Sequence, residues 1–367
     1  AATIYGLLVP FLLGYPVAVG LKAGYGLRRL VWAGPMGLAL LIIALRSLQY
    51  LAPLEKTVWW LSLAFLLCAC YGWLRPSVRG CLKRDLTSLG PGGGVALLCC
   101  GLGLSIALSL PILLHHAIIF DGTENHDSIY YVISAQWAQH HRSSEALQFS
   151  PAAPLYYALT RLLGPAGPEL LLAHASLLLG KEPVYFYNGL LNAGMIWASL
   201  AGILIVPADS YRRFRRRACM GWLLPLFFLM PAMWFIALNS NYGNVFGMVV
   251  FGAYLAAALE WRTASLHRSA ISVLMLGAIA ATYPTLIPFA GLCVVMALLL
   301  QFLLPGRPHR SVMKSILRIG AETAVSVVLF AGFFLSAWAT IASERRISSN
   351  QVIIWPYDAY AGLDPLR

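Results

Sequence analysis

The chain has 367 residues, of which 59% are hydrophobic and only 11% are charged. A soluble domain carries roughly 25% charged residues, so this composition excludes an ordinary soluble protein and indicates one that lies in a membrane. The formal net charge of +12 comes mainly from basic residues between the apolar segments, so we predict contact with membrane lipids and no nucleic-acid partner.

Runs of about 20 apolar residues, each long enough to cross a bilayer as a helix, recur along the whole chain. The first run has no basic segment before it and no small-residue cleavage site after it, so we interpret it as a span rather than a signal peptide. We therefore expect an all-α polytopic membrane protein. Ten spans are predicted, at about residues 1–20, 33–52, 57–74, 93–114, 184–206, 220–238, 244–259, 269–284, 285–304 and 320–341.

Positive charge predicts the orientation of these spans. Of the 26 lysines and arginines, 18 fall in the connections on one side, and basic residues concentrate on the cytoplasmic side of membrane proteins. Basic residues flank the apolar stretch 269–304 at both ends, so we expect it to turn back at Tyr283-Pro284-Thr285. Both termini and the longest connection then lie outside, which for a bacterial inner-membrane protein means the periplasm.

The longest connection runs from about His115 to Glu182 and holds six of the eight histidines and six of the 14 acidic residues. Three short helices are predicted within it, at Asp127–His140, Pro154–Leu163 and Pro168–Leu179. The first is predicted from an apolar stripe, and the others from a proline near the start and a glycine at the end. The third is too short to cross a bilayer, so we expect it in the membrane interface or against the helix bundle. The stripe of the first consists of Ile129, Ile133 and Trp137.

Two fragments of this loop are similar to a known superfamily. The segment from Asp127 to Trp137, Asp-Ser-Ile-Tyr-Tyr-Val-Ile-Ser-Ala-Gln-Trp, resembles the acidic first-loop motif of the aminoarabinose and protein-mannosyl transferase branches of the GT-C glycosyltransferases. The segment Pro154-Leu-Tyr-Tyr157 resembles their later proline-aromatic segment. Here four predicted spans precede the loop, whereas members of the superfamily usually have one.

The resemblance implies transfer of a sugar from a polyprenyl-phosphate-linked donor to an envelope glycan, lipid or protein acceptor at the periplasmic face. It points to Asp127 as the catalytic base, with Glu124 as the nearby second carboxylate. Such a reaction also needs positive charge on the leaving phosphate and groups that hold the sugar. The candidate substrate-binding residues are His126, Tyr130, Tyr131, Tyr156, Tyr157, Arg142, Arg161, Arg345 and Arg346.

A divalent cation, Mg or Mn, is a candidate cofactor. Asp121, Glu124 and Asp127 would supply hard oxygen ligands, and His126 an imidazole. The second residue of the acidic pair in the aminoarabinose branch is Ser128 in this chain, so Asp121 and Glu124 would have to complete the site.

These residues also have structural interpretations. Asp127 could cap its helix, the tyrosines could form an interfacial belt, and Asp121-Gly122 could be a turn. The function likewise has two alternatives, a secondary transporter and a non-enzymatic subunit of an envelope or polysaccharide assembly complex with partner membrane subunits. A transporter usually carries charged residues or broken helices near the membrane midplane, and none stands out in the sequence, which favours an enzyme at the outer face.

The predicted organisation has three parts. Residues 1–92 hold the first three spans, residues 93–341 form a GT-C-like core that includes the loop 115–183, and residues 342–367 form an outer C-terminal segment. The seven cysteines fall in spans or cytoplasmic connections, where we expect no disulfides.

Overall fold

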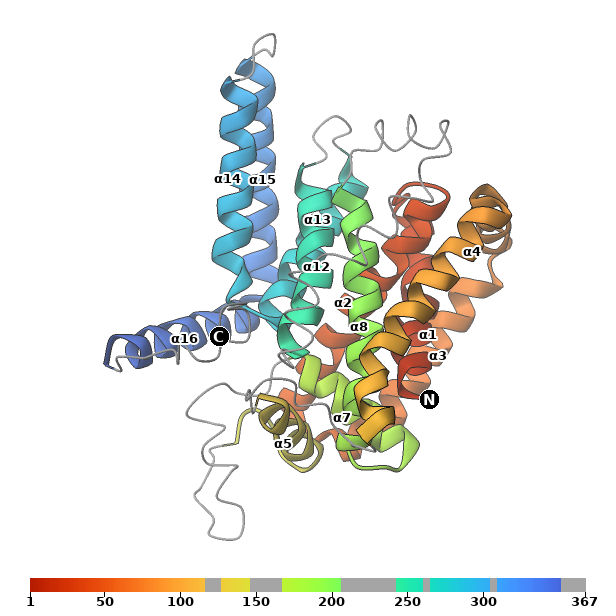
Figure 1. Cartoon of the computed structure of the whole chain (residues 1–367). Helices are drawn as coiled ribbons and strands as arrows, with labels where there is room; N and C mark the ends of the chain where they lie inside the picture. Colours follow the sequence, from red (N-terminus) through yellow and green to blue (C-terminus); the bar gives the residue numbers. More distant parts are fainter. Residues whose placement is uncertain (116–126, 146–166, 206–241, 260–264, 304–308, 351–367) are drawn as a thin grey trace, which may run out of the picture.

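The computed structural model describes residues 1–115, 127–145, 167–205, 242–259, 265–303 and 309–350, and in these segments it is helical throughout, with no strand. The longer helices stand side by side as a bundle (Figure 1). Their bounds are α1 Ala2–Gly20, α2 Leu27–Leu51, α3 Leu54–Leu74, α4 Pro76–His115, α5 Asp127–His140, α7 Gly167–Leu179, α8 Val184–Ile205, α12 Tyr242–Leu259, α13 Leu266–Thr282, α14 Leu286–Leu303, α15 His309–Leu329 and α16 Ala331–Asn350.

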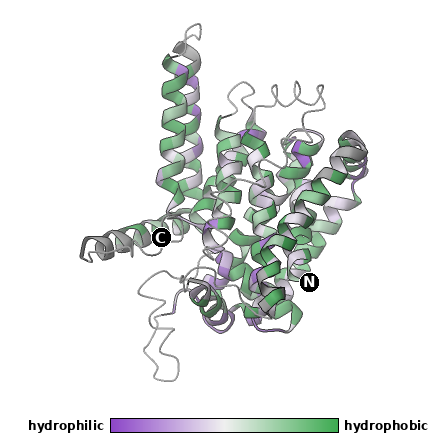
Figure 2. Cartoon of the chain, in the orientation of Figure 1, coloured by the Kyte–Doolittle hydropathy of each residue, from purple (hydrophilic) through white to green (hydrophobic). Residues whose placement is uncertain are grey.

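Seven helices in the described part of the chain are long and apolar enough to cross a membrane, or eight if one bent pair counts as a single span. They lie in α1, α2, α3, α4, α8, α12 and α14, with α15 and α16 as the bent pair. Hydrophobic residues cover these helices along their length (Figure 2). The chain is thus an all-α membrane protein of several spans, as predicted. The predicted sixth span, 220–238, lies outside the described residues, and α13, at the predicted eighth, has 17 residues.

Small residues let α1 and α2 approach closely. A Cβ atom added to Gly14 would lie 1.9 Å from the carbonyl oxygen of Ala33, and one added to Gly37 would lie 1.8 Å from that of Pro10. This antiparallel contact has the small-residue packing that is typical of membrane helices. Both helices also pack against α8, and α2 against α7 and α13, so the first helices share one hydrophobic core with the later ones.

Helix α4 bends at Gly90, whose φ of 66° and ψ of 167° interrupt the helical backbone. The predicted fourth span follows this bend, whereas the segment before it carries Arg79, Lys83 and Arg84. Asp85 anchors that segment to the bundle, because its carboxylate accepts hydrogen bonds from Tyr15 Oη and Gly26 N, each at 2.8 Å, and forms an ion pair with Arg29 at 3.1 Å.

The predicted tenth span, 320–341, is not one straight helix. Helix α15 ends at Leu329, α16 begins at Ala331, and the apolar parts of the two helices are bent by 89°. The ring of Phe330 packs against Gly277 of α13, where a side chain would collide with it. The expectation that no span is broken is therefore wrong. The bend falls at Phe330, with Gly332 next to it, and the Phe330 ring joins this bend to α13.

The two ends of the bundle differ in chemistry. Helices α5 and α7 lie at one end, here called the α5 end, where α2 finishes and α8 and α12 begin (Figure 1). The predicted hairpin is confirmed at this end, since α13 stops at Thr282 and α14 starts at Leu286. The opposite end, here called the basic end, holds the connection between α1 and α2 and the first turn of α13, with Lys22, Arg28, Arg29 and Arg268.

Candidate functional site

Helix α5 begins at Asp127 and ends at His140, as predicted. Ser128, Val132, Ala135 and Gln139 are buried, whereas Ile129 of the predicted stripe is 45% exposed. In a membrane protein an apolar face need not point to the core, because lipid is as apolar as the protein interior and helix contacts favour small and polar residues. The stripe therefore predicted the helix correctly. Of its members, Trp137 is buried, Ile133 is half-buried and Ile129 is exposed, so the stripe and the packed face only partly coincide.

Tyr131 of α5 belongs to a group of four tyrosines, here called the tyrosine cluster, which consists of Tyr131, Tyr187, Tyr242 and Tyr283. The ring of Tyr242 lies 5.7 Å from that of Tyr131 and 5.1 Å from that of Tyr187. Gly243 lies against both Tyr283 and the Tyr131 hydroxyl, so the turn after α13 closes the cluster. Four separate elements thus bring phenol rings together beneath α5.

Two hydroxyl oxygens at this cluster have no hydrogen-bond partner among the described residues. Tyr242 is fully buried, and its Oη makes no hydrogen bond. Thr285 Oγ1, in the turn that contains Tyr283, is also buried without a partner. A buried hydroxyl without a partner costs free energy, and such a group in a native fold calls for an explanation, of which a bound ligand is one.

Helix α7 carries the acidic residue of this region. It is an apolar helix of 13 residues, and it packs against α2, α3, α5, α8 and α12 instead of lying free on the surface. Glu169, in its first turn, is only 7% exposed, and its Oε2 has no hydrogen-bond partner within the part of the chain that the structure describes. Burial raises the pKa of Glu169 to about 7, although a backbone hydrogen bond and the charge of Arg46 oppose the shift. A carboxyl group with such a pKa can take up and release a proton near neutral pH.

Arg46 supplies positive charge at the same end. It lies in α2, within a predicted span, and its guanidinium donates hydrogen bonds to the carbonyl oxygen of Ala281 at 2.7 Å and to Ser336 Oγ at 2.8 Å. It also lies over the ring of Phe333, 5.4 Å from the ring centroid. Arg46 was not among the predicted site residues, because it lies in a mostly apolar predicted span and only the fold brings α13 and α16 to it.

His174 fixes α7 in place. The Tyr5 hydroxyl hydrogen-bonds to Nδ1 at 2.5 Å, and Nε2 lies 3.1 Å from Ser62 Oγ. Ser62 donates its own proton to the carbonyl oxygen of Val58, so its oxygen accepts from Nε2–H and Tyr5 donates to Nδ1. Burial lowers the pKa of His174 to about 4, and the ring is therefore neutral and structural at neutral pH.

The structure brings together only some of the residues proposed from the sequence. Asp127 begins α5, Tyr131 lies in the tyrosine cluster, and Tyr130, 39% exposed, faces away from the bundle. Arg142 forms an ion pair with Glu145, at 3.0 Å, on the surface. Arg345 and Arg346 lie in the C-terminal half of α16.

The remaining candidates lie outside the described residues. They are Asp121, Glu124, His126, Tyr156, Tyr157 and Arg161, together with the predicted helix 154–163. Within the described residues no three of the possible ligands, His, Cys, Asp and Glu, come together as a metal site. A site made of Asp121, Glu124 and Asp127 therefore stays a prediction.

Sequence reasoning treated Glu169 only as an acidic residue near the positive end of a helix dipole. A signal of its importance was present, because the helix is too short to span a membrane, is otherwise almost wholly apolar, and holds a single acid.

Comparison of the chain with protein-family models, with curated proteins and with solved structures found no match.

Proposed function

We propose that this chain is a GT-C-type glycosyltransferase of the bacterial inner membrane, with about ten spans, that moves a sugar from a polyprenyl-phosphate donor to an envelope acceptor at its periplasmic face. The observation that carries the proposal is the arrangement of the α5 end. A short helix that starts with Asp127 covers buried tyrosines and a buried acid, and two oxygens there, Glu169 Oε2 and Tyr242 Oη, lack partners.

The reaction assigns a task to each kind of group. A carboxylate takes the proton of the acceptor hydroxyl, whose oxygen attacks the anomeric carbon of the sugar. The bond between that carbon and the phosphate oxygen breaks, and the polyprenyl phosphate leaves with the electron pair. Asp127 is the proposed base, and Glu169 is a second candidate, because a pKa of about 7 suits proton transfer at neutral pH.

The surrounding groups fit the binding of a sugar phosphate. Phenol rings offer apolar faces to a sugar ring and hydroxyls to its polar edge. Arg46 adds positive charge at this end, which favours an anionic leaving group. The lipid tail of such a donor would lie in the bilayer alongside the apolar spans.

The test is the variant Asp127→Asn, compared with the wild type in cells that lack the gene. Loss of a general base typically lowers the rate by about 10²–10⁴, whereas loss of a helix cap costs only about 1 kcal/mol of stability. We therefore expect Asp127→Asn to be produced and to melt almost like the wild type, but not to restore the missing glycan or glycolipid in mass spectra of the envelope. Glu55→Gln is the matched control, since Glu55 only pairs with His140 on the surface of α5.

A secondary transporter is the second candidate, and two observations favour it. Arg46 lies within a span, and the pair α15 and α16 is sharply bent, both of which occur in transporters. An envelope whose glycans and lipids are unchanged when the gene is deleted would reject the transferase and leave the transporter or the assembly subunit.

A further inference from the structure

Helix α16 lies across the direction of the helix before it. It begins at Ala331, directly after α15, and the apolar parts of the two helices meet at 89°. Figure 1 shows α16 crosswise to α14 and α15, which stand side by side. Helix α14 is long and apolar enough to cross a membrane, so a helix at right angles to this pair runs in the plane of the membrane.

One face of α16 is held by α2 and α13. The Ser336 hydroxyl accepts a hydrogen bond from Arg46 at 2.8 Å, and the guanidinium of Arg46 lies over the Phe333 ring. Arg46 also donates to the carbonyl oxygen of Ala281, one residue before the end of α13. Ala337, one turn after Phe333, is only 1% exposed, so this side of the helix points to the bundle.

These contacts fix the depth of α16. Arg46 lies five residues before the end of α2 at Leu51, which at 1.5 Å per residue is about 8 Å along the helix axis. Ala281 lies in the last turn of α13. Helix α3 starts at the same end of the bundle and exposes Trp59 and Trp60, residues that are enriched at the boundary between lipid and water. Helix α16 is therefore held near the membrane boundary on the side of the α5 end.

The opposite face of α16 is apolar and exposed. Leu335 is 70% exposed and Trp338 is 72% exposed, and residues three apart lie on the same side of a helix. Val328 and Leu329, at the end of α15, are exposed as well, so the apolar surface continues along the chain from one helix to the next. Such a face is unfavourable in water and is typical of a helix in the membrane interface, where a tryptophan ring can contact both lipid tails and head groups.

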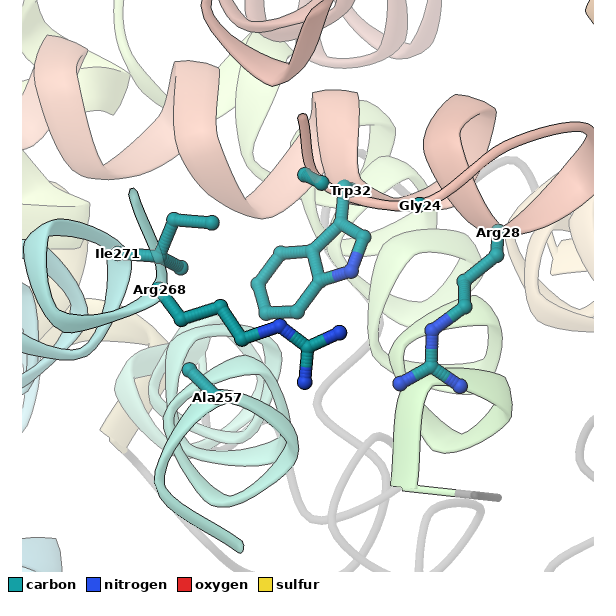
Figure 3. A pocket seen from close by; sticks show the side chains of 7 residues that line it. Gly24, Arg28, Trp32, Ala257, Arg268 and Ile271 are labelled. Carbon is teal, nitrogen blue, oxygen red and sulfur yellow. The ribbon is translucent and has the colours of Figure 1, made fainter. Parts of the chain in front are cut away.

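The basic end of the bundle marks the other side of the membrane. Figure 3 shows Arg28, Arg268 and Trp32 around one small space at that end. Both arginines already interact with other groups of the protein, so neither is available to a ligand there. Since basic residues remain on the cytoplasmic side, α16 belongs to the outer side of the membrane.

We infer that α16 is an interfacial helix that binds the lipid surface on the side of the α5 end, with Leu335 and Trp338 at the boundary between lipid tails and phosphate groups. Through Ser336 the same helix holds Arg46, whose charge acts on Glu169, so the lipid surface supports the α5 end from the side. The inference rests on the contacts and the exposed face of α16, and it does not depend on the proposed glycosyltransferase activity.

The test measures the depth of side chains in the membrane, with the full-length chain in lipid nanodiscs of phosphatidylglycerol and phosphatidylcholine. In a background without the seven cysteines, a spin label is attached at Trp338→Cys, or at Leu335→Cys if the first variant does not fold. Electron paramagnetic resonance then measures collisions of the label with oxygen, which dissolves in lipid tails, and with a nickel chelate, which stays in water. The matched references are Ser144→Cys, exposed beside α5, and Val295→Cys, exposed in the middle of α14.

We expect the ratio of oxygen to nickel collisions for Trp338→Cys to lie between the ratios of the two references. A ratio as low as that of Ser144→Cys would place this face in water, and one as high as that of Val295→Cys would make α16 part of a span. Protection from both reagents would mean that another segment of the chain covers the face. Each of these three outcomes would overturn the inference, and none of them bears on Asp127, so the transferase proposal fails or stands by its own test.

Discussion

At the scale of single residues, Glu169 is the side chain whose environment differs most from that of an ordinary surface acid. Its Oε2 is buried without a partner, and its pKa of about 7 lies well above the usual 4.5. His174, five residues later on α7, is shifted in the opposite direction, with a pKa of about 4 against the usual 6.5. Both shifts arise from burial, which favours the neutral form of each group. Their effects on stability therefore fall in different ranges of pH.

Glu169→Gln should make the protein more stable than the wild type at high pH. The folded state holds the Glu169 proton more tightly than the unfolded chain, so the wild type loses stability as the pH rises from about 4.5 through about 7. Glutamine has no proton to lose. Melting temperatures in detergent should coincide below pH 4.5, and above pH 7 the variant should gain up to about 3 kcal/mol. A wild-type advantage at pH 8 would mean that the ionised carboxylate has a stabilising partner.

The stability of His174→Gln should fall less in acid than that of the wild type. The folded state resists protonation of His174, so wild-type stability is complete above about pH 6.5 and falls as the pH drops towards about 4. The variant should be less stable at pH 7, by about 1–3 kcal/mol, because the hydrogen bonds with Tyr5 and Ser62 are disturbed. Its melting temperature should, however, depend less on pH between 6.5 and 4. Parallel melting curves for the two proteins over this range would contradict the assignment of the acid sensitivity to His174.

At the scale of elements, the sequence predicted the bounds of helices better than the contacts between helices. The bounds of α5, the start of α14 and the length of α7 follow from proline, glycine and apolar periodicity, which act within a few residues of the chain. The bend at Phe330 and the roles of Arg46 and Glu169 depend on contacts between distant helices. For the candidate site, the sequence named Asp127 and Tyr131, whose roles stay predictions. It passed over Arg46, which only the fold brings to its partners, and Glu169, whose local signal is a single acid in a short apolar helix.

Gly14→Ala should separate α1 from α2. The added methyl group would collide with the backbone of Ala33, and a backbone cannot rotate out of the way as a side chain can. Overpacking usually costs about 1–3 kcal/mol, and a backbone collision belongs at the upper end or beyond it. Gly20→Ala in the same helix is the control, because nothing lies within 4 Å of its added Cβ atom. Equal melting temperatures for Gly14→Ala and Gly20→Ala would show that the two helices do not approach as closely as described.

At the scale of the whole molecule, the two ends of the bundle are chemically distinct. Among the described residues, the basic end combines Arg28, Arg29 and Arg268 with the carboxylates of Asp85 and Glu322, both of which have partners. The α5 end combines phenols, a buried acid and the start of α5. The proposed transfer reaction requires the α5 end to lie in the periplasm, so an experiment on orientation bears on it directly.

We expect the α5 end to face the periplasm, since basic residues remain in the cytoplasm. In a background without its seven cysteines, Ser144→Cys should react with a membrane-impermeant maleimide added to intact spheroplasts. Ser144 is exposed next to α5, and its hydroxyl hydrogen-bonds to the carbonyl oxygen of Tyr50 at the end of α2. The mirror control is Thr87→Cys, at an exposed position of α4 at the basic end, which should react only after the membrane is permeabilised. Labelling in the reverse order would place the α5 end in the cytoplasm, where a periplasmic acceptor could not reach Asp127.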